Sequence, residues 1–446
     1  EGHEQDPEAW WQCLCRATGR LMADLAAARI GAEALAGLAV DGTSGTLVCL
    51  DGAGEPVRPG LMYNDGRATA EAEALNGRAG AFCDKLGYRF AASYALAKLL
   101  WVRDHEPEAW ARTVTCTHQA DFAVGRLTGQ FRVTDYSNAL KTGYDLVDEA
   151  WPKWMARLDG VPERLPEVVA PGDRIGAVTA AAADATGLPA GLPVVAGATD
   201  GTAGCLASGV RQPGDYNTTL GTTLTFKGVS RSLARHPQGL IYSHKLPGGL
   251  WLPGAASNTG GEWMGRRFPG ADLKALDAAA EPLLPCAAVA YPLARTGERF
   301  PFKSGEATGF CEPEPASQAE SYAAHLQGTA LVERLAYEVL DEVAGTAGGE
   351  VYGTGGGTRS AVWTQGRADV TGRVYHRPAC PESAFGSAVL AAAGTHFGDV
   401  WQAVARMVRV EATFEPRPGR RAGYDEAYGR LVERLRARGY LASPEP

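Results

Sequence analysis

The stretch GTGGGTRSAVWTQGRADVTGRVYHRPACPESAFGSAVLAAAG occupies residues 353–394 and carries the strongest fold signal in the chain. In VYGTGGGTRSAVW, a β-type run meets a glycine-rich turn over 353–360 that leads directly into a helical pattern. The backbone N–H groups at the start of such a helix attract anions. The later run SAFGSAVLAAAG predicts a helix of small residues that packs closely on a neighbour. Strand and helix patterns alternate through the rest of the chain, which indicates an α/β protein with a mixed sheet.

A second glycine turn lies in the stretch TTLGTTLTF, which places Gly221, Thr222 and Thr223 between two β-type runs. Backbone N–H groups and hydroxyls in such a turn can hold a polyphosphate. Each turn alone is more often structural than functional, whereas the two together favour a nucleotide site. The turn at 353–360 lacks the third glycine and the acidic partner of the dinucleotide fingerprint, which disfavours a nicotinamide oxidoreductase. The sequence also contains no Walker A motif.

Two polar positions follow strand-like runs in the first half. VVAGATDGTAGCLASG places Asp200 between a buried strand pattern and a small-residue helix. A carboxylate there suits a general base or a metal ligand, and a helix-capping role is an equal alternative. In MYNDGRA, Asp65 and Arg67 by themselves predict a surface turn with a local ion pair.

Composition restricts the class of protein. The 446 residues are 45% hydrophobic and 21% charged, with a formal net charge of −8. The length predicts two or three domains, and the acidic balance disfavours binding to nucleic acid or anionic membrane. No apolar run approaches the ~20 residues that span a bilayer. Nine scattered cysteines without a CxxC pair predict reduced thiols and a cytoplasmic location. Neither HExxH nor GxSxG spacing occurs, which disfavours zinc-site and serine-hydrolase chemistry.

Local patterns predict several further elements. Apolar spacing and an acidic start predict a helix from about Pro7 to Ala28. We expect short strands in ALAGLAV (34–40) and TLVCLD (46–51). A long helix is expected over 325–343, and the charged tail 424–440 predicts a helix with one solvated face.

Taken in order, these motifs resemble the FGGY family of carbohydrate kinases. The stretch 165–201 is similar to that family's first-domain ending, and 353–394 is similar to its second-domain signature. The resemblance extends from about residue 6 to 394. It implies an α/β, two-domain actin-like ATPase (ribonuclease H-like) fold with an inter-domain cleft. The expected domains are a sugar-binding domain over 1–203 and a nucleotide-binding domain over 204–446.

The resemblance also implies a role for individual residues. Asp200 matches the catalytic base that accepts the proton of the sugar hydroxyl. Ser44 matches a sugar contact, and Asp65 and Lys98 are further candidates for the substrate pocket. Tyr63 stands where many members carry tryptophan. No protein side chain is implied as a metal ligand. The nucleotide-binding positions are Gly221, Thr222, Thr223, Gly260, Gly261, Gly356, Gly357 and Ser360.

AVDGTSGTLVCLD, VTDYSNALKTGYD, IYSHKLPGGLWLPGAASNTGG and ARTGERFPF look closest to the D-ribulokinase-like pentulose kinases. The implied reaction is ATP- and Mg²⁺-dependent phosphorylation of D-ribulose to D-ribulose 5-phosphate. D-xylulose, L-ribulose or a polyol as substrate, and a catalytically impaired sugar- or nucleotide-binding homologue, are the alternatives. The expected partners are a small sugar and ATP, and a homodimer stays open.

The same resemblance decides whether DGTSGT is the phosphate-binding hairpin or the sugar-side loop of the first domain. In the family, an Asp-x-Gly-Thr phosphate hairpin precedes the helix that begins here near Pro7, so DGTSGT aligns with the sugar-side loop instead. The sequence starts at Glu1, after that hairpin. In the family that hairpin carries an Asp near the magnesium and backbone donors to the phosphates, so we expect the chain as written to be a poor kinase. We also expect it to be less stable, because its first sheet would carry unpaired backbone groups.

Overall fold

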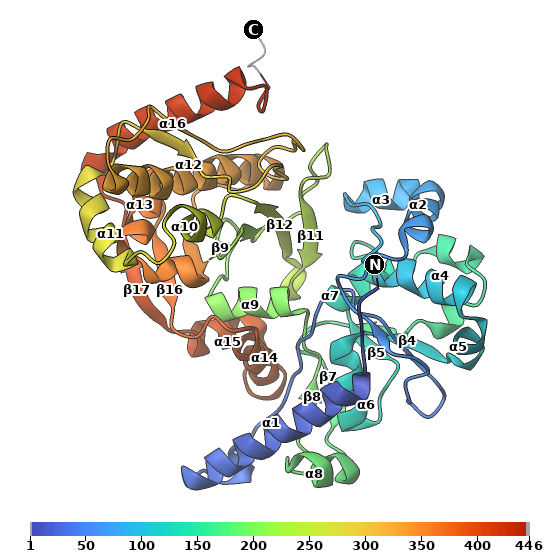
Figure 1. The fold of residues 1–446 in the computed structure, drawn as a ribbon. Coiled ribbons are helices and arrows are strands. Elements are labelled where there is room, and N and C mark those ends of the chain that lie inside the picture. The colour runs from blue at the N-terminus through green and yellow to red at the C-terminus, as the bar shows by residue number, and fades with distance from the viewer. Residues whose placement is uncertain (1, 443–446) are drawn as a thin grey trace. The chain divides into compact units, whose positions relative to one another are not determined.

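The computed structural model describes residues 2–442 (Figure 1). The chain forms two compact units. Unit 1 comprises the residues up to 207 together with 244–249 and 381–407. Unit 2 comprises 208–243, 250–380 and the residues from 408 onward. The domain division at 203/204 that the resemblance implies stays a prediction.

Unit 1 combines short paired strands with helices. β2 pairs antiparallel with β4, β5 pairs parallel with β6, and β7 pairs antiparallel with β8. A further short antiparallel pair joins β1 to β3. The strands are β1 (Glu4–Gln5), β2 (Val48–Leu50), β3 (Gly60–Leu61), β4 (Thr115–Thr117), β5 (Val133–Asp135), β6 (Glu167–Val169), β7 (Arg174–Ala177) and β8 (Pro193–Val195). The α-helices are α1 (Pro7–Ala27), α2 (Thr69–Arg78), α3 (Gly80–Leu86), α4 (Ala95–His105), α5 (Pro107–Arg112), α6 (Gln119–Thr128), α7 (Tyr136–Ala139), α8 (Ala180–Thr186), α9 (Asp200–Ser208), α14 (Ser383–Ala392) and α15 (Val400–Met407).

Helix α1 confirms the first predicted helix to within one residue. Asp6 caps it by accepting a hydrogen bond from the Glu8 N–H group at 2.9 Å, and Pro7 occupies the first turn, where its missing N–H costs nothing. Trp11 is buried in an apolar cluster that includes Phe122 of α6. The helix is therefore held by one apolar face, while most of its other residues are exposed.

The predicted strand over 34–40 is wrong. These residues form a single bridge, Leu38 to Val194, and are partly exposed. The two segments stay close beyond this bridge, since a Cβ on Gly197 would lie 1.9 Å from the Val40 oxygen, but they form only one more isolated bridge, between Gly42 and Thr199. The second predicted strand is present as β2, whose residues are buried.

The small-residue helix predicted near residue 383 is confirmed as α14. A Cβ placed on Gly386 would lie 1.9 Å from the carbonyl oxygen of Ala203, so α14 approaches α9 at backbone contact distance. The glycine is required there because no side chain fits between the two helices. This contact braces the helix that begins at Asp200.

Unit 2 is built on a seven-stranded mixed sheet in the order β11-β12-β10-β9-β15-β16-β17. The pairs β9–β15 and β15–β16 are parallel, whereas β9–β10, β10–β12 and β16–β17 are antiparallel. A separate antiparallel pair joins β13 to β14. The strands are β9 (Tyr216–Leu220), β10 (Leu224–Gly228), β11 (Tyr242–Lys245), β12 (Trp251–Ser257), β13 (Val289–Tyr291), β14 (Phe310–Glu312), β15 (Val351–Thr354), β16 (Tyr375–Pro378) and β17 (Val410–Phe414). The α-helices are α10 (Glu262–Arg267), α11 (Leu273–Ala280), α12 (Gln318–Ala344), α13 (Ala361–Thr371) and α16 (Arg421–Ala437).

Helix α12 confirms the predicted long helix and packs into the main core of unit 2. Its Tyr322 and Tyr337 share an apolar cluster with Tyr216 and Phe226 of the sheet. Glu333 of α12 binds Arg367 of α13 through both carboxylate oxygens at 2.6 and 2.8 Å, and both side chains are fully buried. A doubly hydrogen-bonded buried pair fixes the relative position of two helices, so α13 is firmly seated behind the glycine turn that precedes it.

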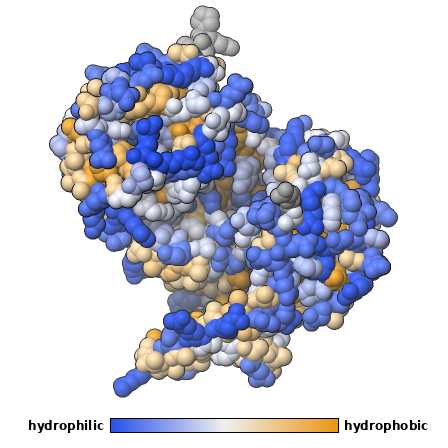
Figure 2. Space-filling view, in the orientation of Figure 1, coloured by the Kyte–Doolittle hydropathy of each residue, from blue (hydrophilic) through white to orange (hydrophobic). Residues whose placement is uncertain are grey.

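The charged tail forms α16, and its Tyr424, Leu431 and Leu435 are buried on one face, as predicted. Figure 2 shows hydrophilic residues over most of the visible surface, with smaller apolar patches between them. Within the described part of the chain, every helix is too short or too polar to cross a bilayer.

Candidate active site

Asp200 is the first residue of α9 and follows the buried strand β8. Its backbone N–H group donates to the Gly42 carbonyl at 2.8 Å, and Thr199 forms a parallel bridge with Gly42. The side chain is exposed, and its Oδ1 accepts a hydrogen bond from the Gly201 N–H group at 2.6 Å. The backbone is therefore fixed while the carboxylate stays accessible to a ligand. The carboxylate contacts the start of α9, as the capping interpretation expects, and its role as a general base stays a prediction.

The loop 41–46 lies beside Asp200 and carries Ser44. Gln119 fixes the loop by accepting from the N–H group and the hydroxyl of Thr43 at 3.0 and 2.8 Å. Gly45 adopts a φ of 91°, which favours glycine. The Ser44 hydroxyl is buried and has no hydrogen-bond partner among residues 2–442. A buried hydroxyl without a partner is costly, so a ligand that hydrogen-bonds Ser44 would satisfy it.

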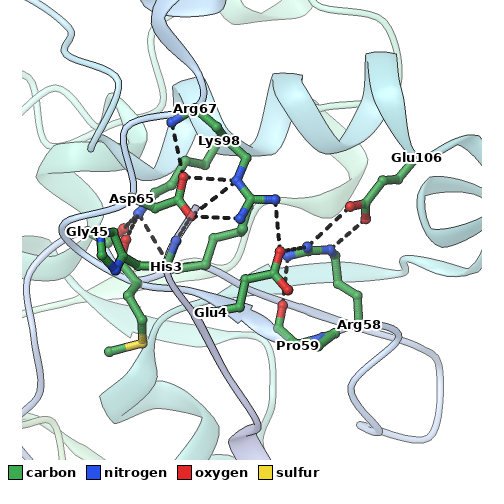
Figure 3. A network of polar contacts seen from close by, with 11 residues as sticks. His3, Glu4, Gly45, Arg58, Pro59, Asp65, Arg67, Lys98 and Glu106 are labelled. Carbon is green, nitrogen blue, oxygen red and sulfur yellow. Dashed lines mark hydrogen bonds and ion pairs between the residues drawn. The ribbon is translucent and has the colours of Figure 1, made fainter. Parts of the chain in front are cut away.

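Lys98 lies inside unit 1 and its side chain is fully buried (Figure 3). Its ammonium donates to the carbonyl oxygens of Gly45, Leu61 and Met62 at 2.6, 3.2 and 2.8 Å. Burial lowers the pKa of Lys98 to about 7, and the nearby carboxylate of Asp65 opposes that shift. All three N–H bonds of the ammonium are used within the protein. Lys98 therefore connects the Ser44 loop to the segment at 61–62 through hydrogen bonds. A direct contact between Lys98 and the sugar stays a prediction.

Asp65 is also fully buried, so the surface-turn interpretation of MYNDGRA is wrong for this residue, although its predicted ion pair with Arg67 is present. Its two oxygens accept from the Arg67 guanidinium at 2.9 to 3.1 Å and from the His3 N–H group at 2.6 Å. Burial raises the pKa of Asp65, but the hydrogen bonds from Arg67 outweigh it and leave the pKa below its usual value. Tyr63 beside it is exposed. The place of Asp65 in a substrate pocket stays a prediction.

Lys141 is a functional candidate that the sequence reasoning missed. Its ammonium donates to the Ser44 carbonyl at 3.1 Å and lies 5.5 Å from the centre of the Tyr94 ring. Burial lowers the pKa of Lys141, while the negative charge of Asp200 raises it. Lys141 thus contacts the loop that carries Ser44 and is influenced electrostatically by Asp200. The motif NALKTG contained it, but nothing local marks this lysine as different from a surface one.

In unit 2, the turn at Gly221, Thr222 and Thr223 connects β9 to β10. The turn meets Gly260 and Gly261, which lie between β12 and α10: the Gly261 N–H group donates to the Gly221 carbonyl at 2.7 Å. A Cβ on Gly260 would lie 2.4 Å from the Thr222 oxygen. The structure therefore brings these five predicted nucleotide positions together, and glycine is required for the approach.

The third glycine turn lies at the same end of β9. Gly355 has a φ of 85°, and a Cβ on Gly357 would lie 2.4 Å from the Leu220 side chain. Gly356 is exposed with open space around it. Ser360 caps α13 by accepting from the Trp363 N–H group at 3.0 Å. All eight predicted nucleotide positions thus lie in unit 2 around one strand end, and their contact with a nucleotide stays a prediction.

Glu298 supports this region and was also missed. It is buried, and one of its oxygens accepts from the N–H groups of Asn258 and Arg299 at 2.8 and 2.9 Å. The other accepts from the hydroxyls of Ser257 and Tyr291 at 2.9 and 2.6 Å. Four hydrogen bonds to one buried carboxylate hold the chain that leads into Gly260 and Gly261.

Comparison with known proteins identifies the family. Residues 1–207 match the N-terminal domain of the FGGY family of carbohydrate kinases, and residues 216–395 match its C-terminal domain. The chain belongs to this family. This FGGY kinase is therefore a phosphotransferase that acts on a sugar, as the sequence predicted, with the two-domain actin-like ATPase fold.

Relatives of this FGGY kinase include pentulose kinases. A xylulose kinase from Streptomyces rubiginosus is 32% identical over 415 residues, which is 91% of this chain and 82% of the relative. The crystal structure of a xylulose kinase from Rhodospirillum rubrum has a TM-score of 0.85 and 29% identity, and the match covers 98% of this chain and 90% of that one. Glycerol kinase of Plasmodium falciparum with ADP shares the fold, with a TM-score of 0.82 at 16% identity over 99% of this chain and 91% of that one.

Proposed function

We propose that this FGGY kinase transfers the terminal phosphoryl group of ATP to a pentulose, and that D-xylulose is its preferred substrate. Two relatives at 32 and 29% identity carry the name xylulose kinase, which supports a pentulose and favours this sugar. D-ribulose, which the sequence motifs favoured, is the second candidate. The two sugars differ at one hydroxyl, which a few pocket side chains discriminate.

Asp200 supplies the base. Its exposed carboxylate accepts the proton of the sugar 5-hydroxyl, and the oxygen forms a bond to the γ-phosphorus. The bond between that phosphorus and the β–γ bridging oxygen breaks, and ADP leaves with the electron pair. Ser44 supplies a free hydroxyl for hydrogen bonding to the sugar, and Lys141 places a positive charge beside both groups.

The glycine turns of unit 2 supply the nucleotide site. Thr222 and Gly356 are exposed, and the backbone N–H groups of such turns suit phosphate oxygens. Mg²⁺ neutralises phosphate charge in such reactions and is commonly held by the phosphates, water and one or two carboxylates. Residues 2–442 contain no group of three or more His, Cys, Asp and Glu side chains able to hold a metal.

The observation that carries the proposal is the accessible carboxylate of Asp200 on a backbone fixed by Gly42. Asp200→Asn keeps the shape but removes the base, so it should lower kcat by about 10²–10⁴. ATP affinity, measured by calorimetry, should stay unchanged. A variant that retains wild-type turnover would exclude Asp200 as the base.

The sugar is tested by sugar-dependent ADP release with D-xylulose, D-ribulose and L-ribulose. We expect the highest kcat/KM with D-xylulose. A higher value with D-ribulose would select the second candidate, and calorimetric sugar binding without ADP release would instead indicate a non-catalytic sugar-binding protein.

A further inference from the structure

A chain of buried hydrogen bonds runs from Asp135 to the residue before Asp200. The Ser137 hydroxyl donates to the Asp135 carboxylate and accepts from the Thr199 N–H group at 2.9 Å. Asp135, Ser137 and Thr199 are 3, 0 and 2% exposed. These hydrogen bonds therefore connect residues 137 and 199, which are 62 positions apart, inside unit 1. Because the site is buried, water cannot replace a hydrogen bond that is lost there.

The groups at the two ends of this series of hydrogen bonds decide which atom donates and which accepts at each step. A backbone N–H can only donate, so the Ser137 oxygen must accept from Thr199 and its hydrogen must point elsewhere. The Asp135 carboxylate receives that hydrogen, and the same oxygen accepts from the N–H groups of Ser137 and Asn138 at 2.7 and 3.2 Å. Asp135 thus orients the hydroxyl that holds Thr199.

Thr199 is a junction between this chain and the candidate base. Its hydroxyl contacts the Thr202 hydroxyl at 2.9 Å, and its carbonyl accepts from the N–H groups of Thr202 and Ala203 in α9. The next residue is Asp200. Displacement of Thr199 would therefore move the first turn of α9 together with the carboxylate at its start.

We infer that Ser137, oriented by Asp135, is a positioning residue that sets the location of the Asp200 carboxylate. The inference rests on the proposed role of Asp200 as the base. The segment that carries Ser137 also carries Lys141, whose ammonium donates to the Ser44 carbonyl at 3.1 Å. One short stretch, 135–142, therefore holds the backbone next to the candidate base and also contacts the Ser44 loop.

The first test is steady-state kinetics of Ser137→Ala. We expect kcat to fall about 10–100-fold, because a displacement of about 1 Å can cost that much. KM for the sugar should change less than about threefold, since the Ser44 loop is held separately by Gln119 and Lys98. Equal kcat in the variant and the wild type would overturn the inference.

Thr186→Ala is the matched control. Thr186 lies in α8 of the same unit, is fully buried, and its hydroxyl accepts from the Leu188 N–H group at 3.3 Å and donates to the Ala182 carbonyl at 2.6 Å. The control removes the same kind of bond with no link to Asp200. It should lower the melting temperature without lowering kcat, so an equal loss of kcat in both variants would indicate a general packing effect.

Asp135 offers a conservative rescue. In Asp135→Asn, the amide oxygen can still accept from Ser137, while the amide nitrogen replaces the oxygen that accepts from the Asn138 side chain at 2.6 Å. The Asn138 Oδ1 atom has no hydrogen-bond partner in the described chain, so rotation of that amide provides a matching acceptor. Asp135→Asn should keep kcat within about threefold of the wild type, whereas Asp135→Ala should match Ser137→Ala. Equal kcat values for the two Asp135 variants would contradict the inference.

A double-mutant cycle separates this inference from the proposed function. If Ser137 acts through Asp200, adding Ser137→Ala to Asp200→Asn should lower kcat no further. Multiplicative losses would show that Ser137 acts elsewhere, even with Asp200 as the base. Wild-type turnover by Asp200→Asn alone would instead overturn the proposed function. Should Ser137→Ala not fold, Ser137→Cys keeps a side chain of similar shape but weakens the hydrogen bond from the Thr199 N–H group, so kcat should still fall, and wild-type kcat would count against the inference.

Discussion

The ammonium group of Lys141 lies 3.1 Å from the carbonyl oxygen of Ser44, a residue 97 positions earlier in the chain. The contact connects residue 141 to the Ser44 loop. Burial lowers the pKa of Lys141, and the negative charge of Asp200 opposes that shift. The sugar site that we propose for unit 1 therefore includes a cation as well as a carboxylate.

Replacement of Lys141 by methionine should lower kcat/KM for the sugar by about 10–100-fold, because a hydrogen bond from a charged group contributes about 1.5–3 kcal/mol. ATP affinity should be unaffected. Lys153→Met, which changes an exposed lysine of the same unit, is the control and should behave as the wild type. Unchanged sugar kinetics in Lys141→Met would show that this lysine only supports the loop.

Lys98 should give the free energy of unfolding a characteristic dependence on pH. Burial lowers its pKa from 10.5 to about 7 in the folded protein. Between these values the unfolded chain binds more protons, so folded stability rises with pH and is lost as pH falls through about 7. Lys98→Met lacks this titration. The stability of the wild type relative to the variant should therefore increase by about 1.4 kcal/mol per pH unit above pH 7, measured by urea unfolding at pH 7, 8 and 9. A constant difference would contradict the assignment.

Glu298→Ala should raise KM for ATP by about 5–50-fold while leaving KM for the sugar unchanged. The variant leaves the buried N–H group of Asn258 without its acceptor and releases the chain that leads to Gly260. Glu298→Gln should be milder, because its amide oxygen can serve the two N–H groups and the hydroxyls of Ser257 and Tyr291 can rotate to accept. Glu306→Gln, at an exposed position nearby, is the control. Equal ATP kinetics in all three variants would show that the hydrogen bonds of Glu298 do not hold Gly260 and Gly261 in place for ATP.

Gly260→Ala should lower the free energy of unfolding by about 1–3 kcal/mol, because its Cβ would meet the backbone of Thr222 and Thr223. Gly356→Ala is the matched comparison, since a Cβ there meets nothing within 4 Å. Thermal unfolding of both variants tests the difference. Two equal melting temperatures would show that the turn relaxes to accommodate the methyl group.

Elements with a strong local signal could be predicted from the sequence. The acidic start and the apolar spacing after it located α1 to within a residue. Glycine and threonine in the sequence indicated the turns around Gly221 and Gly356. The strand predicted over 34–40 failed because its pattern is only apolar. Whether an apolar run pairs with a neighbour depends on backbone approach, here between Gly197 and Val40, which no local pattern contains.

The candidate site was predictable only through the resemblance and only in part. Lys141 and Glu298 were missed because what distinguishes them is their partners, which lie 97 and 40 positions away. The resemblance pointed to Asp65 and Lys98 as candidates for the substrate pocket, and that role stays a prediction. The structure adds that their polar atoms bind Arg67, His3 and backbone carbonyls. A sequence shows which residues could take part in binding or catalysis. It does not show whether the polar atoms of those residues already have hydrogen-bond partners within the protein.

The route of the chain between the two units has a consequence during synthesis. Unit 1 takes its last segment, 381–407, from beyond the bulk of unit 2, and Gly386 of that segment lies against α9 at Ala203. On the ribosome, the helix that begins at Asp200 must wait for more than a hundred further residues before its covering partner emerges. Nascent chains and fragments that stop near residue 207 therefore carry the aspartate on a helix with one face bare, a surface for chaperones to recognise.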